Sequence, residues 1–283
     1  MGARDAAGRI FVEAVSAPRL SRVMASLADA RLPGPVLRSL IRAWIRAYGV
    51  DMSEAAEPIG AFPTFNAFFT RRLRAGARPV DGDPHAVVSP CDSRVYSIGP
   101  VPETGLLEQI KGKTYALDAL LGSPEDAAPF RRGVHATLYL SPSMYHRVHS
   151  PVDGLVRAWR YLPGRLYPVN ALAVRHVEQL FAVNERVAVF FDTERFGPVA
   201  VVFVGATNVG RISLSFAEVR TNAGRPPTSV TATPPVPLAR GAELGAFNLG
   251  STIVLFAADA ALRPAGVDAG AVIRVGQALW RCR

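Results

Sequence analysis

Three segments that lie far apart in the chain supply a hydroxyl, an imidazole and a carboxylate. Asp92 precedes a short apolar run, and His146 and His149 stand three residues apart. Ser251 follows Gly250 and opens the apolar segment at 253–256. A serine hydroxyl paired with an imidazole and a carboxylate can attack a carbonyl, and such a set is recognised by its geometry and not by its order in the chain. These residues make Ser251 a candidate nucleophile.

Each segment also has a simpler explanation. Asp92 can cap its own turn through the backbone, and the two histidines can be ordinary loop residues. A Gly-Ser pair before an apolar run is common at loop-to-strand junctions, and a GxSxG elbow is excluded because Ile253 stands where its second glycine would be. A zinc site is not predicted, since neither an HExxH motif nor a cysteine pair adds further ligands to the histidines.

The chain is basic and rich in arginine. Its net charge is +9, and Lys111 and Lys113 are its only lysines. A positive surface attracts nucleic acid or anionic lipid. No familiar nucleic-acid motif occurs, and the aromatic residues do not alternate with arginines as base-stacking platforms would. The composition therefore predicts an anionic membrane surface as the partner, and no nucleic acid.

Few features suggest export or a membrane span. The two cysteines are too few for a disulfide framework, and no apolar run reaches the length of a transmembrane helix. The N-terminus lacks the long apolar centre of a signal peptide. We expect a protein of the cytoplasm on these grounds.

The elements that position the candidate residues divide the chain into two parts. Residues 1–58 are predicted to be mainly helical, most clearly at 36–48, where apolar residues recur with helical spacing beside a stripe of three arginines, Arg38, Arg42 and Arg46. Such a helix suits a membrane interface, but packing on the protein's own core is the commoner fate of an amphipathic helix. Residues 59–283 are predicted to be β-rich.

The β-rich part contains short apolar segments separated by Gly and Pro. Strands are predicted at 86–88, 95–98, 136–140, 187–191, 199–204, 211–216, 253–256 and 272–275. No long helix alternates with them, which favours an α+β fold with a mainly antiparallel sheet over a doubly wound one. Residues 222–240, rich in Pro and Thr, are predicted to be an extended, exposed connection.

A family resemblance covers residues 36 to 278. The chain resembles phosphatidylserine decarboxylases of the long bacterial type, whose motifs occur in family order: VDMSEA (50–55), TFNAFF (64–69), RPVD (78–81), SPCD (89–92), KGKTY (111–115), YHRVH (145–149), NERV (184–187), VGAT (204–207) and LGST (249–252). The tetrapeptide LGST alone is a weak signal. Its combination with YHRVH and NERV at family-like spacing is strong.

The resemblance implies a role for each candidate residue. Ser251 would become a pyruvoyl group after the chain cuts itself between Gly250 and Ser251, and Asp92 and His149 would be its partners in that reaction. His146 would serve decarboxylation at the substrate. Cys91, Ser93 and Asn208 depart from the family pattern, in which Ala, Gly and an apolar residue are usual.

The chemistry of decarboxylation explains why a carbonyl is needed. Loss of carbon dioxide leaves an electron pair on the α-carbon, and a pyridoxal cofactor would require a Schiff-base lysine in a suitable phosphate site. Neither Lys111 nor Lys113 has one. The covalent pyruvoyl group implied by the resemblance would accept the electron pair as phosphatidylserine is converted to phosphatidylethanolamine. The self-cleavage that forms this group would leave subunits of residues 1–250 and 251–283.

The resemblance further implies a homodimer of the processed unit, bound peripherally at the cytoplasmic face of the cell membrane. Three alternatives stay open from the sequence. One is a serine hydrolase that uses the same three residues, the second is a non-catalytic membrane-binding relative, and the third is a pyruvoyl enzyme for another amine-bearing lipid.

Overall fold

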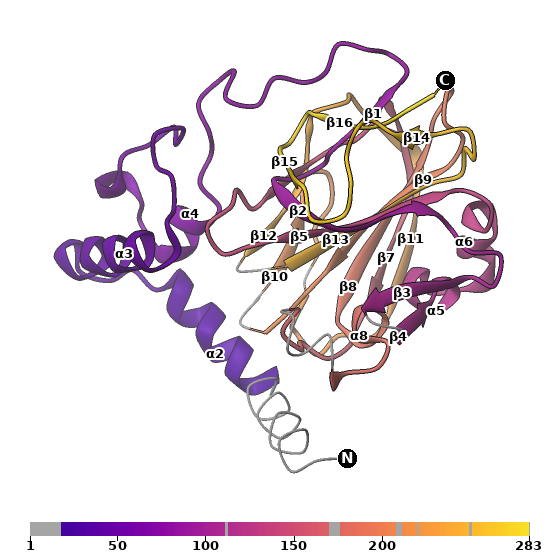
Figure 1. Ribbon diagram of the computed structural model, residues 1–283. Coiled ribbons are helices and arrows are strands. Elements are labelled where there is room, and N and C mark those ends of the chain that lie inside the picture. The colour runs from indigo at the N-terminus through magenta and orange to yellow at the C-terminus, as the bar shows by residue number, and fades with distance from the viewer. Residues whose placement is uncertain are drawn as a thin grey trace.

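The computed structural model describes residues 18–110, 113–169, 176–207, 211–219, 221–248 and 251–282. Residues 1–17 of the predicted helical part lie outside this range, as do Lys111, Asn208 and Gly250 of the motifs. Within it, N-terminal helices are followed by a β-rich body, as an α+β fold predicts (Figure 1).

The N-terminal part contains α2 (Pro18–Asp29), α3 (Gly34–Tyr48), the 3-10 turn η1 (Ile59–Ala61) and α4 (Phe65–Phe69). Helix α3 confirms the prediction for 36–48. Pro35 stands in its first turn, where a missing N–H costs nothing, and Gly49 ends it in the left-handed region at φ 68°. Thr64 caps α4 by accepting a hydrogen bond from the N–H of Ala67 at 3.1 Å.

Helix α3 is apolar over more than the face it buries. Leu37 and Ile41 pack with the phenylalanines of α4 in a cluster separate from the core of the β-rich body. Leu40 and Tyr48, by contrast, are 45% and 47% exposed. Core packing therefore accounts for one side of the helix and leaves a second apolar side uncovered. The cluster that contains Leu37 and Ile41 also includes phenylalanines of α4 between Phe65 and Phe69. These residues lie after 58/59, the boundary predicted from sequence between the helical and the β-rich parts.

An eight-stranded antiparallel sheet forms the body. Its order is β11-β7-β8-β9-β13-β5-β2-β15. The bounds are β2 Ser93–Pro100, β5 Val134–Leu140, β7 Gly154–Leu162, β8 Arg186–Asp192, β9 Val199–Val204, β11 Thr228–Leu238, β13 Ser251–Ala257 and β15 Val272–Ile273. β8, β9 and β13 are the innermost strands and nearly continuous in apolar residues, as expected of strands covered on both faces.

Smaller sheets and short helices complete the body. One sheet has the order β10-β12-β6, one β1-β16-β14, and one β3-β4. The bounds are β1 Ala86–Val88, β3 Leu106–Ile110, β4 Lys113–Ala116, β6 Arg147–His149, β10 Arg211–Leu214, β12 Glu243–Asn248, β14 Arg263–Pro264 and β16 Ala278–Arg281. The short helices are α5 Leu117–Leu121, α6 Pro124–Ala127, η2 Ala128–Phe130 and α8 Leu180–Val183.

The prediction of a simple connection at 222–240 was wrong. Residues Thr228–Leu238 form β11, which pairs with β7 along its length except for an irregular stretch between Thr231 and Val236. β11 is the edge strand of the large sheet, and an edge strand tolerates proline because its outer side needs no donors. The exposed, extended character was predicted correctly, but the pairing was not.

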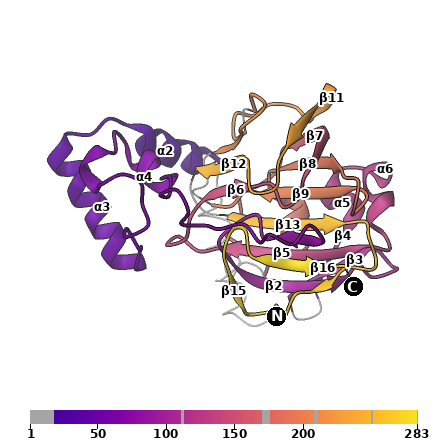
Figure 2. The same ribbon diagram turned by 90° about the horizontal axis from the view of Figure 1, so that it is seen from above.

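Figures 1 and 2 show α2, α3 and α4 gathered beside one end of the β-rich body. In Figure 2 the neighbouring strand of the body is β12. Side chains also join the two parts: Asn66 on α4 donates to Asp29 of α2 and to Asn248 at the end of β12, each at 2.9 Å. The helices are therefore attached to the strand that leads toward Ser251.

Candidate active site

Two chain crossings bring the predicted site residues together. The chain leaves the large sheet at Leu140, turns, and enters the small sheet as β6 at Arg147. It makes the opposite passage from β12, which ends at Asn248, to β13, which begins at Ser251. Because β13 pairs with β5 while β12 pairs with β6, the two crossings lie side by side.

Ser251 stands at the beginning of β13, opposite Leu140 of β5. The next residue, Thr252, pairs with Tyr139 on one side and with Val204 of β9 on the other. The backbone of the serine is thus held within the large sheet, beside Leu140, after which the chain turns toward His146 and β6. Gly250 lies outside the described residues, and the Ser251 side chain is not described.

His149 is held by a carbonyl and a phenol. Its Nδ1 lies 2.8 Å from the carbonyl oxygen of Gly241, and its Nε2 lies 3.1 Å from the hydroxyl of Tyr145. A carbonyl can only accept, so Nδ1 carries the proton and Tyr145 donates to the lone pair of Nε2. Burial lowers the pKa of His149, which favours this neutral form.

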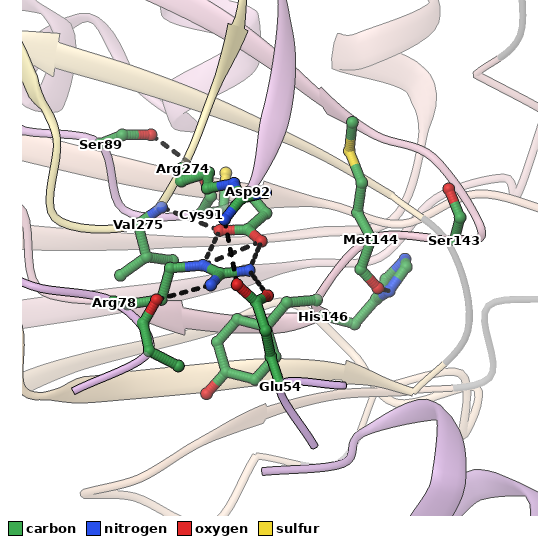
Figure 3. A network of polar contacts seen from close by, with 12 residues as sticks. Glu54, Arg78, Ser89, Cys91, Asp92, Ser143, Met144, His146, Arg274 and Val275 are labelled. Carbon is green, nitrogen blue, oxygen red and sulfur yellow. Dashed lines mark hydrogen bonds and ion pairs between the residues drawn. The ribbon is translucent and has the colours of Figure 1, made fainter. Parts of the chain in front are cut away.

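Asp92 contacts Arg78 in place of an imidazole. Nε of Arg78 lies 2.9 Å from Oδ1 of Asp92, and Nη2 lies 2.6 Å from Oδ2. The N–H of Val275 donates to Oδ1 at 2.9 Å. Figure 3 shows Arg78 between the carboxylates of Asp92 and Glu54. Within the described residues we find no hydrogen bond from Asp92 to His149, and the Gly241 carbonyl fills the orienting position that a catalytic aspartate would occupy.

Asp92 and His149 are nevertheless neighbours. The N–H of His149 donates to the carbonyl of Pro90, two residues before Asp92, at 2.8 Å. Burial lowers the pKa of His149, and the negative charge of Asp92 offsets part of this lowering. The carboxylate therefore favours the imidazolium ion that forms when this histidine takes up a proton.

His146 is completely buried on the other side of the turn. Its ring lies against Phe69, with centroids 4.1 Å apart, and its Nδ1 lies 2.9 Å from the carbonyl oxygen of Met144. Nδ1 must therefore carry the proton, and Nε2 presents a lone pair that has no hydrogen-bond partner in the described part of the chain. Burial lowers the pKa of His146 to about 3. An unpaired buried nitrogen of this kind is costly, and a catalytic role is one explanation for it.

Two hollows lie on either side of this turn. One is an apolar groove of ≈ 490 Å³ between the helices and the body, lined by Met24, Leu27, Leu40, Trp44, Phe69 and Pro142 among others. The other is a polar cavity of ≈ 190 Å³ whose charged lining residues are Asp51, Glu54, Arg71, Arg78, Asp92 and Arg274. Ser143, Met144 and Tyr145 of the turn line this second cavity.

Sequence comparison decides the family. A family model described as phosphatidylserine decarboxylase matches residues 65–281. The chain belongs to the phosphatidylserine decarboxylase family. A phosphatidylserine decarboxylase proenzyme of Bordetella petrii is 47% identical over 243 residues, which cover 83% of each chain. One of Ectopseudomonas mendocina is 45% identical over 267 residues, which cover 92% of each, and one of Myxococcus xanthus is 43% identical over 236 residues, covering 83% of this chain and 84% of the relative.

The departures from the decarboxylase pattern leave the described site intact. Ser93 is not among the non-glycine residues with positive φ, so it carries no left-handed strain where the family has glycine. Cys91 is fully buried, and burial raises the pKa of its thiol, which packs as a small apolar group. Asn208 lies outside the described residues.

Three groups of the candidate site could not be assigned from the sequence. Arg78 was visible in the RPVD motif and Tyr145 in YHRVH, but neither motif says which side chain the residue contacts. The carbonyl of Gly241 carries no sequence signal, because any residue has one. Its place is fixed by a turn whose glycine has φ 83°.

Proposed function

We propose that this chain converts phosphatidylserine to phosphatidylethanolamine and carbon dioxide after cutting itself between Gly250 and Ser251. The observation that carries the proposal is the pairing of Leu140 with Ser251, since it sets Ser251 beside the start of the segment 141–149, which contains both histidines. The names of the relatives, which are proenzymes, support the same reading.

Self-cleavage is a reaction of the chain's own residues. In our proposal Ser251 loses its proton to Nε2 of His149, and its oxygen attacks the carbonyl carbon of Gly250. The C–N bond breaks, and the amide becomes an ester. Removal of the α-proton of Ser251 then expels the Gly250 carboxylate, and hydrolysis of the resulting enamine releases ammonia and leaves a ketone at the new N-terminus.

The surrounding groups support this use of His149. The Gly241 carbonyl fixes the tautomer that has its lone pair on Nε2, and the negative charge of Asp92 stabilises the imidazolium that follows. Tyr145 holds that lone pair in the precursor, so its hydroxyl must turn away or pass a proton on before the serine is activated. Arg78 keeps Asp92 in place.

The residues around Ser251 fit a covalent pyruvoyl group. The position opens an inner strand opposite Leu140, and six residues further along His146 offers an Nε2 without a hydrogen-bond partner among the described residues. When formed, the group supplies a carbonyl that takes up the electron pair left by carbon dioxide. No dedicated pocket for a separate cofactor is required.

His146 has a proton-carrying role in the second reaction. As a neutral imidazole it cannot donate from Nε2, so it must first take a proton. We infer that it takes this proton from the ammonium group of the bound substrate and later returns it to the α-carbon. Its low pKa, about 3, keeps Nε2 unprotonated at neutral pH until the substrate is bound.

A membrane surface suits the exposed apolar side of the helices. Val23, Leu27 and Val36 are each more than half exposed on α2 and α3, and α3 also carries Arg38, Arg42 and Arg46. Such a surface can lie in the interface of an anionic bilayer. No helix in the described ranges is long and apolar enough to cross a membrane. We propose peripheral binding at the cytoplasmic face, and a homodimer of the processed unit.

Mass spectrometry of the purified protein under denaturing conditions tests the proposal. The wild type should give fragments of residues 1–250 and 251–283, the smaller without a free α-amine, while Ser251→Ala stays as one chain of 30.3 kDa. The processed protein should release carbon dioxide from phosphatidylserine in vesicles. A wild type that stays intact would contradict the mechanism and favour a hydrolase or a non-catalytic relative. A cleaved protein without turnover would favour another amine-bearing lipid.

A further inference from the structure

Arg71 is a buried cation without a carboxylate partner. It is 5% exposed and lies just after α4, with Nη2 donating to the carbonyl of Ser143 at 3.2 Å. Its Nε is buried and makes no hydrogen bond to the described residues. An arginine is almost never buried in this way unless its charge is balanced. The guanidinium of Arg71 lies over the ring of Phe68, 5.7 Å from its centroid, and its unused donors are available to an anion.

The other arginines of the polar cavity are already balanced. Arg78 bridges Asp92 and Glu54, at 2.6 Å and 2.8 Å, and Arg274 lies 3.0 Å from Glu54. Arg71 makes no ion pair within 4 Å in the part of the chain that the structure describes, although Asp51 and Asp92 influence it from further away. An incoming anion would therefore find, in Arg71, a guanidinium that is bonded to a carbonyl but to no carboxylate among the described residues.

The position of Arg71 relative to His146 is suitable for a substrate ligand. Arg71 follows Phe69, whose ring lies on His146, and it bonds to Ser143 in the same turn. Nδ1 of His146 lies 2.9 Å from the carbonyl oxygen of Met144, the residue after Ser143. A molecule bound to Arg71 would thus lie at the turn that also carries His146.

The two hollows together have the form required by an amphiphile. Three chain segments give neighbouring residues to both: Tyr48 lines the groove and Gly49 the cavity, Phe69 the groove and Arg71 the cavity, Pro142 the groove and Ser143 the cavity. A lipid whose apolar part follows the groove would direct its polar part toward Arg71.

We propose that Arg71 binds the phosphodiester of the lipid headgroup, an inference that rests on the proposed function. The headgroup carries two anions, and guanidinium binds either of them. A strong contact to the carboxylate would stabilise the substrate and be lost as carbon dioxide leaves, which would slow the reaction. A contact to the phosphodiester is kept from substrate to product, so it holds the lipid without that penalty.

Calorimetry with dihexanoyl phosphatidylethanolamine, kept below its micelle concentration, tests this assignment. The ligand has the phosphodiester and lacks the carboxylate. Arg71→Met should weaken its binding to the processed enzyme by about tenfold to a hundredfold, the range for a hydrogen bond to a charged group. Arg71→Lys should recover part of the loss. Arg72→Met is the matched control, since it removes the same charge from an exposed side chain one residue along.

The outcomes separate the two anions and the two proposals. If Arg71→Met binds the ethanolamine lipid normally but shows a raised KM for dihexanoyl phosphatidylserine, the carboxylate is the contact and the assignment is overturned. Unchanged affinity and KM would overturn any anion-binding role. If Arg71→Met does not fold, Arg71→Lys and Arg71→Gln carry the comparison. Failure of the proposed function would appear separately, as a wild type that binds lipid without turning it over.

Discussion

The guanidinium of Arg78 holds both oxygens of the Asp92 carboxylate, with Nη2 at 2.6 Å from Oδ2 and Nε at 2.9 Å from Oδ1. Both side chains are almost entirely buried, and Arg78 also lies 2.8 Å from Glu54. Burial lowers the pKa of Arg78, but its hydrogen bonds to Asp92 and Glu54 outweigh that effect and raise it. The aspartate beside His149 is therefore a fixed charge whose position depends on an arginine.

Removing Arg78 should destabilise the protein strongly. Arg78→Met leaves Asp92 buried and uncompensated, and breaking a buried ion pair costs about 3 kcal/mol or more. Urea unfolding of the Ser251→Ala precursor, with and without Arg78→Met, measures the loss. A variant that carries both Arg78→Met and Asp92→Asn in this precursor should lose less free energy of unfolding than the two single changes added together. The reason is that no unpaired charge remains. Additive losses would contradict a coupled pair.

Much of the fold could be predicted from the sequence where one pattern decides the environment. The inner strands β8, β9 and β13 are apolar runs, and α3 has clear helical spacing. β7 was missed, because Arg157 and Arg160 interrupt its apolar residues. Both arginines lie over the ring of Phe190 on the neighbouring strand, a contact that the sequence cannot reveal.

The site was predictable in composition but not in connectivity. The motifs point to Asp92, His146, His149 and Ser251, and the topology places their segments together. Which group faces which depends on long-range pairing: Gly241 reaches His149 across 92 positions of sequence, and Val275 reaches Asp92 across 183. Neither separation leaves a local pattern.

The hydroxyl of Tyr145 should affect the pH dependence of self-cleavage. It donates to Nε2 of His149 and so favours the neutral imidazole. Burial raises the pKa of Tyr145 to about 12, so the hydroxyl stays protonated at neutral pH. In Tyr145→Phe the pKa of His149 should rise toward its ordinary value, and the acid limit of cleavage should move to higher pH. A time course of fragment formation across pH checks this, and an unmoved limit would exclude the role.

Buried histidines should make the precursor sensitive to acid. Burial lowers the pKa of His146 to about 3 and that of His135 to about 4, from 6.5 in both cases. The unfolded chain then binds protons that the folded chain refuses, so stability is complete above about pH 6.5 and falls below it. Between about pH 7.5 and pH 5.5 each should contribute roughly 1 kcal/mol of loss.

Thermal unfolding of the Ser251→Ala precursor across this range measures the effect. Glu185 acts in the opposite direction, because burial raises the pKa of its carboxyl above the ordinary value of 4.5. Its protonation therefore favours the folded chain as the pH falls. A variant with His135→Leu added should show a shallower decline, because one of the protons is no longer taken up. An equal slope with and without His135 would contradict this origin of the pH dependence.

Replacing His146 should separate the two reactions. His146→Gln keeps a polar side chain of similar reach but cannot accept and return a proton. Self-cleavage uses His149 and should continue, so the fragments still form. Turnover of phosphatidylserine by the cleaved protein should fall by about a hundredfold to ten-thousandfold, the usual contribution of a general acid-base group. Loss of cleavage with intact folding would instead place His146 in the first reaction.

The exposed apolar side of α2 and α3 should determine binding to vesicles. Leu27 and Leu40 are 57% and 45% exposed, and both line the apolar groove. Changing both to Ser removes apolar area that would enter the bilayer interface, and sedimentation with phosphatidylglycerol vesicles should weaken by about tenfold or more. Leu106→Ser is the matched control, since this leucine is 46% exposed on β3, away from the helices in both views of the molecule (Figures 1 and 2). Equal weakening by the control would show that no particular face docks. A variant that keeps full vesicle binding would assign attachment to charge alone, and then high salt should release it.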